Sequence, residues 1–348
     1  MNKFLSILLL CAAVSCNGAA TTDMPEWRWG EVETPTQKDP YPEYTRAGWK
    51  HVTADFQPAL PEGISIYRSP DELGGQKVIA FIAIADTSLI AWDVKSIDDP
   101  AISGTREALK TPSAYYSETA APVILNGGYF FSEGGKQYNA SVAVSAGRTY
   151  GVNINYASLD WKTMYYPTRG VFYQMDGKIG TGWTYWGGGA RHYLYEKPSA
   201  NSWEADPLPV PDATFPEQAK DFAPQTAIGG GPVLIKGRQP VNTWKEELFY
   251  GNGAEDKMPL ARHPRSAIGI TGEGRLLLFV CEGRGMTPGV AGMTFAEEAE
   301  VLKSLGCTDA LNLDGGGSSC LLVQGQKTIQ CSDGGERAVG SVIILKKK

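Results

Sequence analysis

The chain has 348 residues and a formal net charge of -6, with 42% hydrophobic and 20% charged residues. These values are near the globular average and exclude a disordered or fibrous chain. An acidic balance without a basic run argues against nucleic acid as the main partner. The 41 glycines and the many aromatic residues favour turns and short strands over a helix bundle.

Residues 1–16 have the form of a signal peptide. Lys3 precedes an apolar run at 4–14, which is too short to span a bilayer. Cys16 follows this run after small residues, as in bacterial lipoprotein signals. We therefore expect an exported lipoprotein of the bacterial cell envelope, with a lipid on Cys16 as its only membrane contact. Ordinary cleavage near residue 20 is the alternative.

The rest of the chain divides by composition. Residues 17–63 are polar and rich in Pro and Trp, which predicts a tether and an irregular arm. Residues 64–348 are predicted to form one domain, with a Pro-rich excursion at 190–225. Strand patterns lie at 78–86, 88–94, 122–131, 164–174, 179–186, 231–235, 266–270, 276–281, 310–313, 320–323, 328–331 and 339–345. The first two are expected to pair with each other.

One helix is well marked. Thr294 and Glu297 form a capping box, residues 295–305 carry an apolar stripe, and Gly306 ends the segment. A weaker helix is predicted at 113–121. With few helices and many strands, we predict an α+β fold whose β-rich core is a mixed or antiparallel sheet with a few helices packed on it.

Export would permit disulfide bonds. A hairpin turn at residues 325–326 would place Cys320 opposite Cys331, so these two residues are expected either to form a bridge or to remain thiols. Cys281 and Cys307 lie in apolar segments and are predicted to be buried thiols.

Several familiar sites are missing from the sequence. The chain has three histidines and no HExxH motif, which argues against a zinc site built mainly of histidine. It also has no GxSxG motif and no phosphate-binding Walker loop.

Polar residues beside glycines at strand ends are the remaining candidates. Singly, each fits a turn or a surface ion pair, but together they predict a functional site. They are Asn126, His263, Arg265, Glu282, Arg284, Asp314, Ser318 and Ser319.

These segments resemble the phosphodiester glycosidase family. The matching pieces are NGGYF at 126–130, PRSAIG at 264–269, EGR at 282–284, GMTFAEEAEVLKSLG at 292–306 and ALNLDGGGSS at 310–319. Glu282 stands where the family usually has Asp, and Ser266 stands where Thr is common.

The resemblance implies hydrolysis of a sugar joined through its anomeric carbon to a phosphodiester. We hypothesise that Asp314 is the nucleophile or the base for water and that Glu282 is the second carboxylate. The predicted phosphate and substrate contacts are Arg265, Arg284, His263, Asn126, the backbone N–H groups of Gly315 and Gly316, and the hydroxyls of Ser318 and Ser319, the last four as an anion nest.

The expected partner is a carbohydrate phosphate, and no cofactor is expected. Two alternatives keep the same segments. Asp314, Glu282 and Asn126 could hold a divalent cation for phosphodiester cleavage. A non-catalytic envelope protein could instead bind glycan through the aromatic-rich arm.

Overall fold

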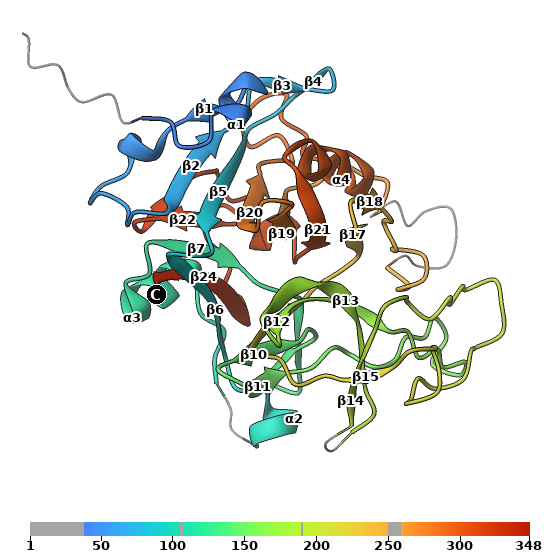
Figure 1. The fold of residues 1–348 in the computed structure, drawn as a ribbon. Coiled ribbons are helices and arrows are strands. Elements are labelled where there is room, and N and C mark those ends of the chain that lie inside the picture. Colours follow the sequence, from blue (N-terminus) through green and yellow to red (C-terminus); the bar gives the residue numbers. More distant parts are fainter. Residues whose placement is uncertain (1–37, 105–106, 189–190, 250–258) are drawn as a thin grey trace, which may run out of the picture. The chain divides into compact units, whose positions relative to one another are not determined.

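The computed structural model describes residues 38–104, 107–188, 191–249 and 259–348. The chain divides into two compact units, 1–38 and Asp39–Lys348, and the second is described below. Cys16 and the rest of the predicted signal peptide lie outside the described residues. Strands dominate the second unit, and every strand pairing described is antiparallel (Figure 1). The predicted β-rich α+β class is therefore confirmed.

Three sheets make up most of the unit, and their strand orders follow. The eight-stranded sheet runs β1 (Lys50–His51), β2 (Ile64–Arg68), β5 (Ala80–Asp86), β20 (Arg275–Cys281), β19 (Arg265–Thr271), β21 (Cys307–Asn312), β17 (Val233–Lys236), β18 (Gln239–Pro240). The seven-stranded sheet runs β11 (Arg148–Gly151), β10 (Ala143–Ser145), β16 (Thr226–Gly229), β12 (Arg169–Met175), β13 (Lys178–Trp186), β14 (His192–Tyr195), β15 (Lys220–Asp221). The five-stranded sheet runs β23 (Gln326–Lys327), β22 (Leu321–Val323), β7 (Val123–Asn126), β24 (Ser341–Lys347), β6 (Ile90–Ser96).

Two small hairpins and a few helices complete the described residues. The hairpins are β3 (Glu72–Leu73) with β4 (Gln76–Lys77) and β8 (Phe130–Glu133) with β9 (Lys136–Asn139). The helices are α1 (Pro42–Arg46), η1 (Thr53–Asp55), α2 (Pro100–Ser103), α3 (Pro112–Thr119), α4 (Phe295–Ser304) and η2 (Gly316–Ser318). Helix α4 has the predicted capping box. None of the helices described is both long and apolar enough to cross a membrane.

The central strands carry apolar residues on both faces because both faces of the largest sheet are covered. In β20, Leu276 and Leu278 face a core shared by the three sheets, whereas Leu277 and Phe279 face the core beneath α4. A strand buried on both sides has no solvent face, so it does not alternate. The ends of these strands carry the polar residues of interest.

The structure also corrects two predictions about strands. Residues 80–86 and 90–96 do not pair, because β5 joins the eight-stranded sheet and β6 the five-stranded sheet. The predicted strand at 328–331 is absent, and β23 at 326–327 pairs with β22 instead. The excursion at 190–225 contributes β14 and β15 to the seven-stranded sheet. Short, mostly polar strands such as β15 carry little periodic signal.

The four cysteines after residue 280 are free and buried. Leu322 lies opposite Lys327, so the hairpin turn falls one residue earlier than predicted and Cys320 does not face Cys331 across it. A hydrogen bond nevertheless joins these two thiols, raising the pKa of Cys320 and lowering that of Cys331. Oxidation to a disulfide stays a prediction.

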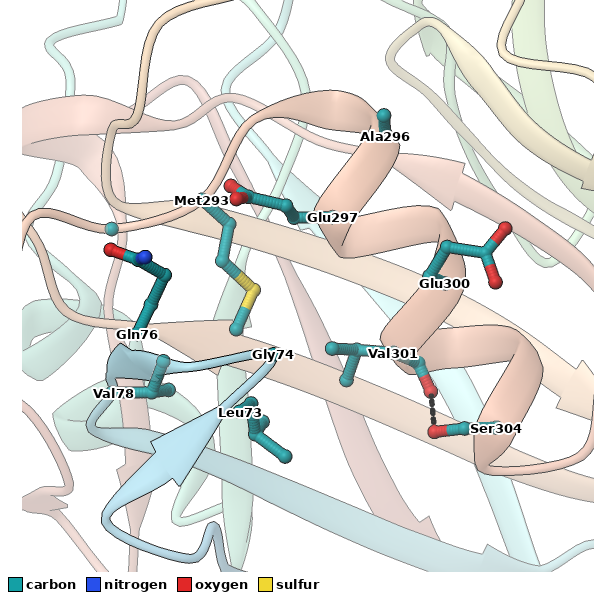
Figure 2. A pocket seen from close by; sticks show the side chains of 11 residues that line it. Leu73, Gly74, Gln76, Val78, Met293, Ala296, Glu297, Glu300, Val301 and Ser304 are labelled. Atoms are coloured by element: carbon teal, nitrogen blue, oxygen red, sulfur yellow. Dashed lines mark hydrogen bonds between the residues drawn. The ribbon is translucent and has the colours of Figure 1, made fainter.

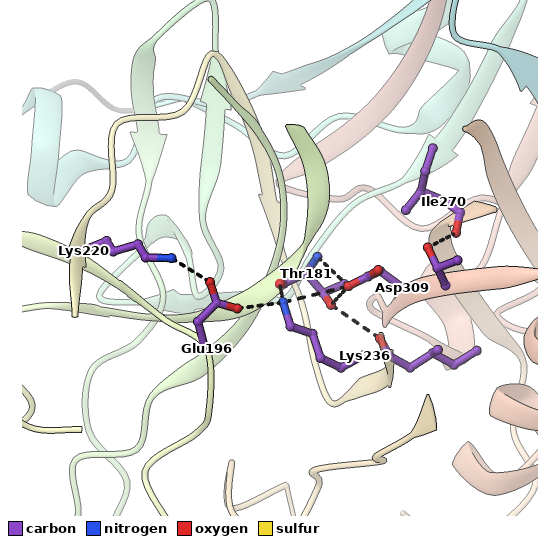
Figure 3. Close-up of polar contacts among 8 residues, drawn as sticks. Thr181, Glu196, Lys220, Lys236, Ile270 and Asp309 are labelled. Carbon is purple, nitrogen blue, oxygen red and sulfur yellow. Dashed lines mark hydrogen bonds and ion pairs between the residues drawn. The ribbon is translucent and has the colours of Figure 1, made fainter. Parts of the chain in front are cut away.

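A line of polar contacts joins the seven-stranded and eight-stranded sheets (Figure 3). Glu196 pairs with Lys220 at 2.9 Å and with Lys236 of β17 at 3.3 Å. Lys236 lies 3.9 Å from Asp309 of β21, which accepts a 2.9 Å hydrogen bond from Thr181 of β13. Because partly exposed ion pairs add little stability, we infer that this line mainly sets how the two sheets meet.

Candidate active site

Asp314 stands just beyond β21, where the chain leaves the largest sheet. Its backbone N–H donates to the carbonyl of Gly127 at 3.1 Å, and its carboxylate accepts hydrogen bonds from the Ser318 hydroxyl and the Gly315 N–H. Burial nevertheless raises the pKa of Asp314 to about 6, with these bonds and nearby arginines opposing the rise. At pH 7 the carboxyl is therefore mostly ionised and can take up a proton readily.

The glycine turn after Asp314 needs glycine for a local reason. Gly316 has φ +60°, and a Cβ there would lie 2.6 Å from Nη2 of Arg284. Its N–H donates to the carbonyl of Pro264 at 2.9 Å. The anion nest expected from Gly315 and Gly316 is therefore not formed, because one N–H faces Asp314 and the other is bonded within the protein.

Two guanidinium groups act on the Asp314 carboxyl. Arg284 and Arg337 both lower its pKa. Arg284 lies 3.6 Å from Asp333, and Arg337 makes bonds of 2.8 Å and 2.5 Å to the same carboxylate. Nη1 of Arg337 also lies 3.3 Å from the Ser318 hydroxyl. A cationic group thus borders a carboxylate that can ionise.

Arg337 was missed in the sequence. It lies in the segment SDGGERAVG, ahead of the last strand. The criterion that selected Arg284, a charged residue beside glycines at a strand end, would have selected it too.

Arg265 and His263 belong to the segment that lies against the glycine turn, since the carbonyl of Pro264 accepts from the N–H of Gly316. Nε of Arg265 donates to the carbonyl of Met293 at 2.8 Å, and its guanidinium lies 4.0 Å from the centre of the Phe295 ring. The pKa of His263 is lowered by burial and by the charges of Arg265 and Arg284, so the imidazole is neutral at pH 7. Its Nδ1 is buried without a hydrogen-bond partner.

Tyr129, from the NGGYF segment, is influenced by charges from both Asp314 and Arg265. Burial raises its pKa, and the charges of Asp314 and Arg265 act on it in opposite directions. Its hydroxyl donates to the carbonyl of Gly231 at 2.8 Å and accepts from Asn312 at 3.1 Å. Arg265 and Asp314 therefore both lie close enough to this phenol to influence its ionisation.

Asn126 lies inside the protein, beneath Asp314. Its oxygen accepts from Ser266 at 2.7 Å and from the N–H of Cys320 at 3.1 Å. Its nitrogen donates to the carbonyls of Asp314 at 2.7 Å and Gly127 at 3.3 Å. All four positions of the amide are used. We expected a ligand contact, but these bonds make Asn126 a residue that positions Asp314.

Glu282 is buried and bonded to two loops. Its carboxylate accepts from the N–H of Thr287 at 2.8 Å and from the N–H of Gln330 at 3.1 Å. It lines a cavity of about 530 Å³ that Asp314 does not line. Glu282 is therefore placed to hold the loop that carries Arg284, and its role as the second carboxylate stays a prediction.

Two buried polar side chains near the site have no hydrogen-bond partner. Ser319 follows Ser318, and its hydroxyl makes no hydrogen bond. Glu298 of α4 has both carboxylate oxygens unpartnered, and burial raises its pKa to about 8 against the opposing charge of Arg265. Glu298 was also missed, although it stands within the apolar stripe of a predicted helix.

Two other findings bear on how the site is read. Among the described residues, no group of three or more His, Cys, Asp or Glu side chains could hold a metal ion. A cavity of about 410 Å³ lies between the β3–β4 hairpin and α4, lined by residues such as Leu73, Met293 and Val301 (Figure 2). Asp314 and the arginines around it do not line it, so this cavity is separate from the candidate site.

The fold and the site together define a β-rich protein with an acid and guanidinium groups at strand ends. Residues 119–346 match the phosphodiester glycosidase family. Because the match covers more than half of the chain, the protein belongs to that family.

Individual relatives are more distant. YomE, an uncharacterised SPβ prophage-derived protein of Bacillus subtilis, is 41% identical over 84 residues, which are 24% of this chain and 13% of YomE. The chain thus matches only a small part of that relative's length.

Two solved structures share the fold. The zebrafish N-acetylglucosamine-1-phosphodiester α-N-acetylglucosaminidase catalytic domain has a TM-score of 0.53 at 18% identity, covering 82% of this chain and 83% of that one. A hypothetical protein from Synechocystis has a TM-score of 0.52 at 18% identity, covering 85% and 67%.

Proposed function

We propose that this protein hydrolyses the bond between the anomeric carbon of a sugar and a phosphodiester oxygen. One observation carries the proposal: the Asp314 carboxyl, with a pKa of about 6, lies within the influence of Arg284 and Arg337. Membership of the phosphodiester glycosidase family supports it.

The leaving group explains why guanidinium groups suit this reaction. Glycoside hydrolysis normally needs a carboxylic acid to protonate the leaving oxygen. A phosphate monoester has a second pKa of about 6, so it can leave with little protonation. Arginine stays charged and binds two phosphate oxygens at once. Arg284 and Arg337 would therefore stabilise the negative charge that develops on the departing phosphate.

The ionised Asp314 would act at the anomeric carbon. As base, it takes a proton from water while the water oxygen bonds to that carbon and the carbon–oxygen bond to phosphate breaks, its electron pair leaving with the phosphate. As nucleophile, it bonds to the carbon while the carbon–oxygen bond to phosphate breaks and its electron pair leaves with the phosphate; water then adds to the same carbon, breaks the bond to Asp314 and releases the sugar and the free carboxylate. The configuration of the released sugar, inverted or retained, distinguishes the two.

A matched pair of variants tests the proposal. Asp314→Asn should abolish release of sugar from a glycosyl-1-phosphodiester, because the amide cannot act as base or nucleophile. Asp309→Asn, on the strand that precedes Asp314, should keep most of the activity. Full turnover by Asp314→Asn would refute the role.

Isotope labelling tests which bond breaks. In water with labelled oxygen, cleavage at carbon puts the label into the sugar. Label found in the phosphate instead would mean cleavage at phosphorus, and the glycosidase proposal would fail.

We also propose that the substrate is a carbohydrate phosphate of the cell envelope, reached by export and anchoring through Cys16. The support is the N-terminal sequence alone. Incorporation of radiolabelled palmitate that a Cys16→Ser variant loses would test the anchor.

A further inference from the structure

A further hollow is lined by residues of the seven-stranded sheet, the β8–β9 hairpin and the loops beside them. Its volume is about 460 Å³, within the usual range for small-ligand sites. Aromatic side chains from three separate segments line it, together with one arginine. These lining residues are Phe131, Tyr156, Trp161, Trp203 and Arg169.

A hydrogen-bonded turn keeps the side chain of Trp161 exposed to solvent. Its side chain is 77% exposed, and its φ of +57° is one that bulky residues avoid. The turn is fixed by Asp160, whose carboxylate accepts 2.8 Å bonds from the N–H groups of Lys162 and Thr163. The backbone N–H of Trp161 donates to the Ser158 hydroxyl at 2.9 Å. Strain that serves to expose an indole is characteristic of binding sites.

The other rings are supported from behind. Trp203 packs edge-on against Tyr165 with ring centres 4.9 Å apart, and the Tyr165 hydroxyl donates to the carbonyl of Ala205. Phe131 stacks on Tyr138 at 5.0 Å. The hollow therefore offers flat apolar surfaces whose positions are already set, which lowers the entropy lost on binding.

Arg169 supplies an unsatisfied polar group. Its side chain is only 9% exposed, and its Nε is buried with no hydrogen-bond partner. Nη1 donates to the carbonyl of Glu247, and burial lowers the pKa of Arg169 to about 10 against the opposing charge of Glu247. An unpaired buried donor is costly, so a ligand oxygen that satisfied it would be favoured. Because Glu247 already supplies a negative charge near Arg169, the ligand does not have to be an anion.

A chain of ring contacts links this hollow to the candidate active site. The Arg169 guanidinium lies 5.0 Å from the centre of the Phe249 ring. Phe249 in turn lies 5.4 Å from Tyr129, the phenol whose pKa Asp314 influences. Arg169 of the hollow is thus connected through Phe249 to Tyr129 of the candidate active site.

We infer that this hollow is a saccharide subsite, which binds uncharged sugar rings of the substrate beyond the bond that is cleaved. The apolar face of a pyranose ring packs on flat aromatic side chains, and its hydroxyls can accept from Arg169. A lipid chain would leave Nε of Arg169 unpaired. The inference rests on the proposed function for the role of the subsite in catalysis.

The test uses the full chain carrying Asp314→Asn, so that bound saccharide is not turned over. The probe is a printed array of neutral oligosaccharides. We expect a defined group of them to bind, and addition of Trp161→Ala should weaken their apparent affinity at least tenfold. Because Trp161 is exposed, this change should not unfold the protein. Leu89→Ala, at another exposed apolar residue, is the matched control and should bind as before.

Two results would overturn the inference: no oligosaccharide retained, or equal binding with and without Trp161. These outcomes are separate from failure of the proposed function. That failure would appear as sugar release by the Asp314→Asn protein in the phosphodiester assay, whatever the array shows.

Discussion

Replacing Ser318 by alanine tests the electrostatics of the site directly. The Ser318 hydroxyl is the foremost of the contacts that hold down the pKa of Asp314. Hydrogen bonds to charged groups contribute about 1.5–3 kcal/mol. Because one pKa unit corresponds to about 1.4 kcal/mol, losing this bond should raise the pKa of Asp314 by about one to two units, from about 6 to about 7 or 8.

The assay is the pH profile of kcat/KM on a glycosyl-1-phosphodiester. The acidic limb reports the essential base of the free enzyme. We expect the wild-type limb near pH 6 and the Ser318→Ala limb displaced upward by at least one unit. At pH 6.5 the variant should be several-fold slower, whereas above pH 9 the two proteins should converge, because Asp314 is then ionised in both.

Ser319→Ala is the matched control. It removes the neighbouring hydroxyl, which makes no hydrogen bond, so its acidic limb should coincide with that of the wild type. An unmoved limb in Ser318→Ala, or equal displacement in both variants, would show that this hydrogen bond does not set the ionisation of Asp314.

Two further variants separate stability from catalysis. Asp314→Asn should raise the free energy of unfolding at pH 8. The folded-state pKa of about 6 lies above the usual 3.8, so the charged carboxyl destabilises the fold above pH 6, by at most about 3 kcal/mol. In urea titrations the gain should therefore be present at pH 8 and vanish at pH 4. Glu282→Gln should lower the free energy of unfolding by about 1–3 kcal/mol. The carboxylate accepts from the N–H groups of Thr287 and Gln330 with one oxygen each, whereas an amide has a single oxygen and would turn its NH2 group toward the other N–H. An unchanged melting temperature would contradict that positioning role.

Local signals in the sequence were sufficient for several elements. The hairpin of β12 and β13 follows from its Asp176-Gly177 turn, since both residues adopt positive φ. Helix α4 follows from its capping box and apolar stripe. In each case the interactions that define the element join residues close together in the chain.

Pairing between distant segments could not be read in the same way. Strands β5 and β6 are neighbours in sequence, but they join different sheets. Strand β5 lies between the nearby β2 and the distant β20, whereas β6 pairs with the distant β24. The hairpin beyond Cys320 was misplaced by one residue, since both candidate turns contain Gly325.

The sequence by itself identified the glycine-flanked polar residues at strand ends, because glycine beside a charge marks places where backbone and ligand can approach closely. Only the tertiary structure decided their roles. It places Arg337 near Asp314 and pairs the Asn126 amide in four internal hydrogen bonds. It also binds the carboxylate of Glu282 to the N–H groups of two loops. The physical reason is that burial and neighbouring groups set the ionisation of a side chain and decide which of its hydrogen-bond donors and acceptors remain unpaired. Both depend on segments far apart in the chain.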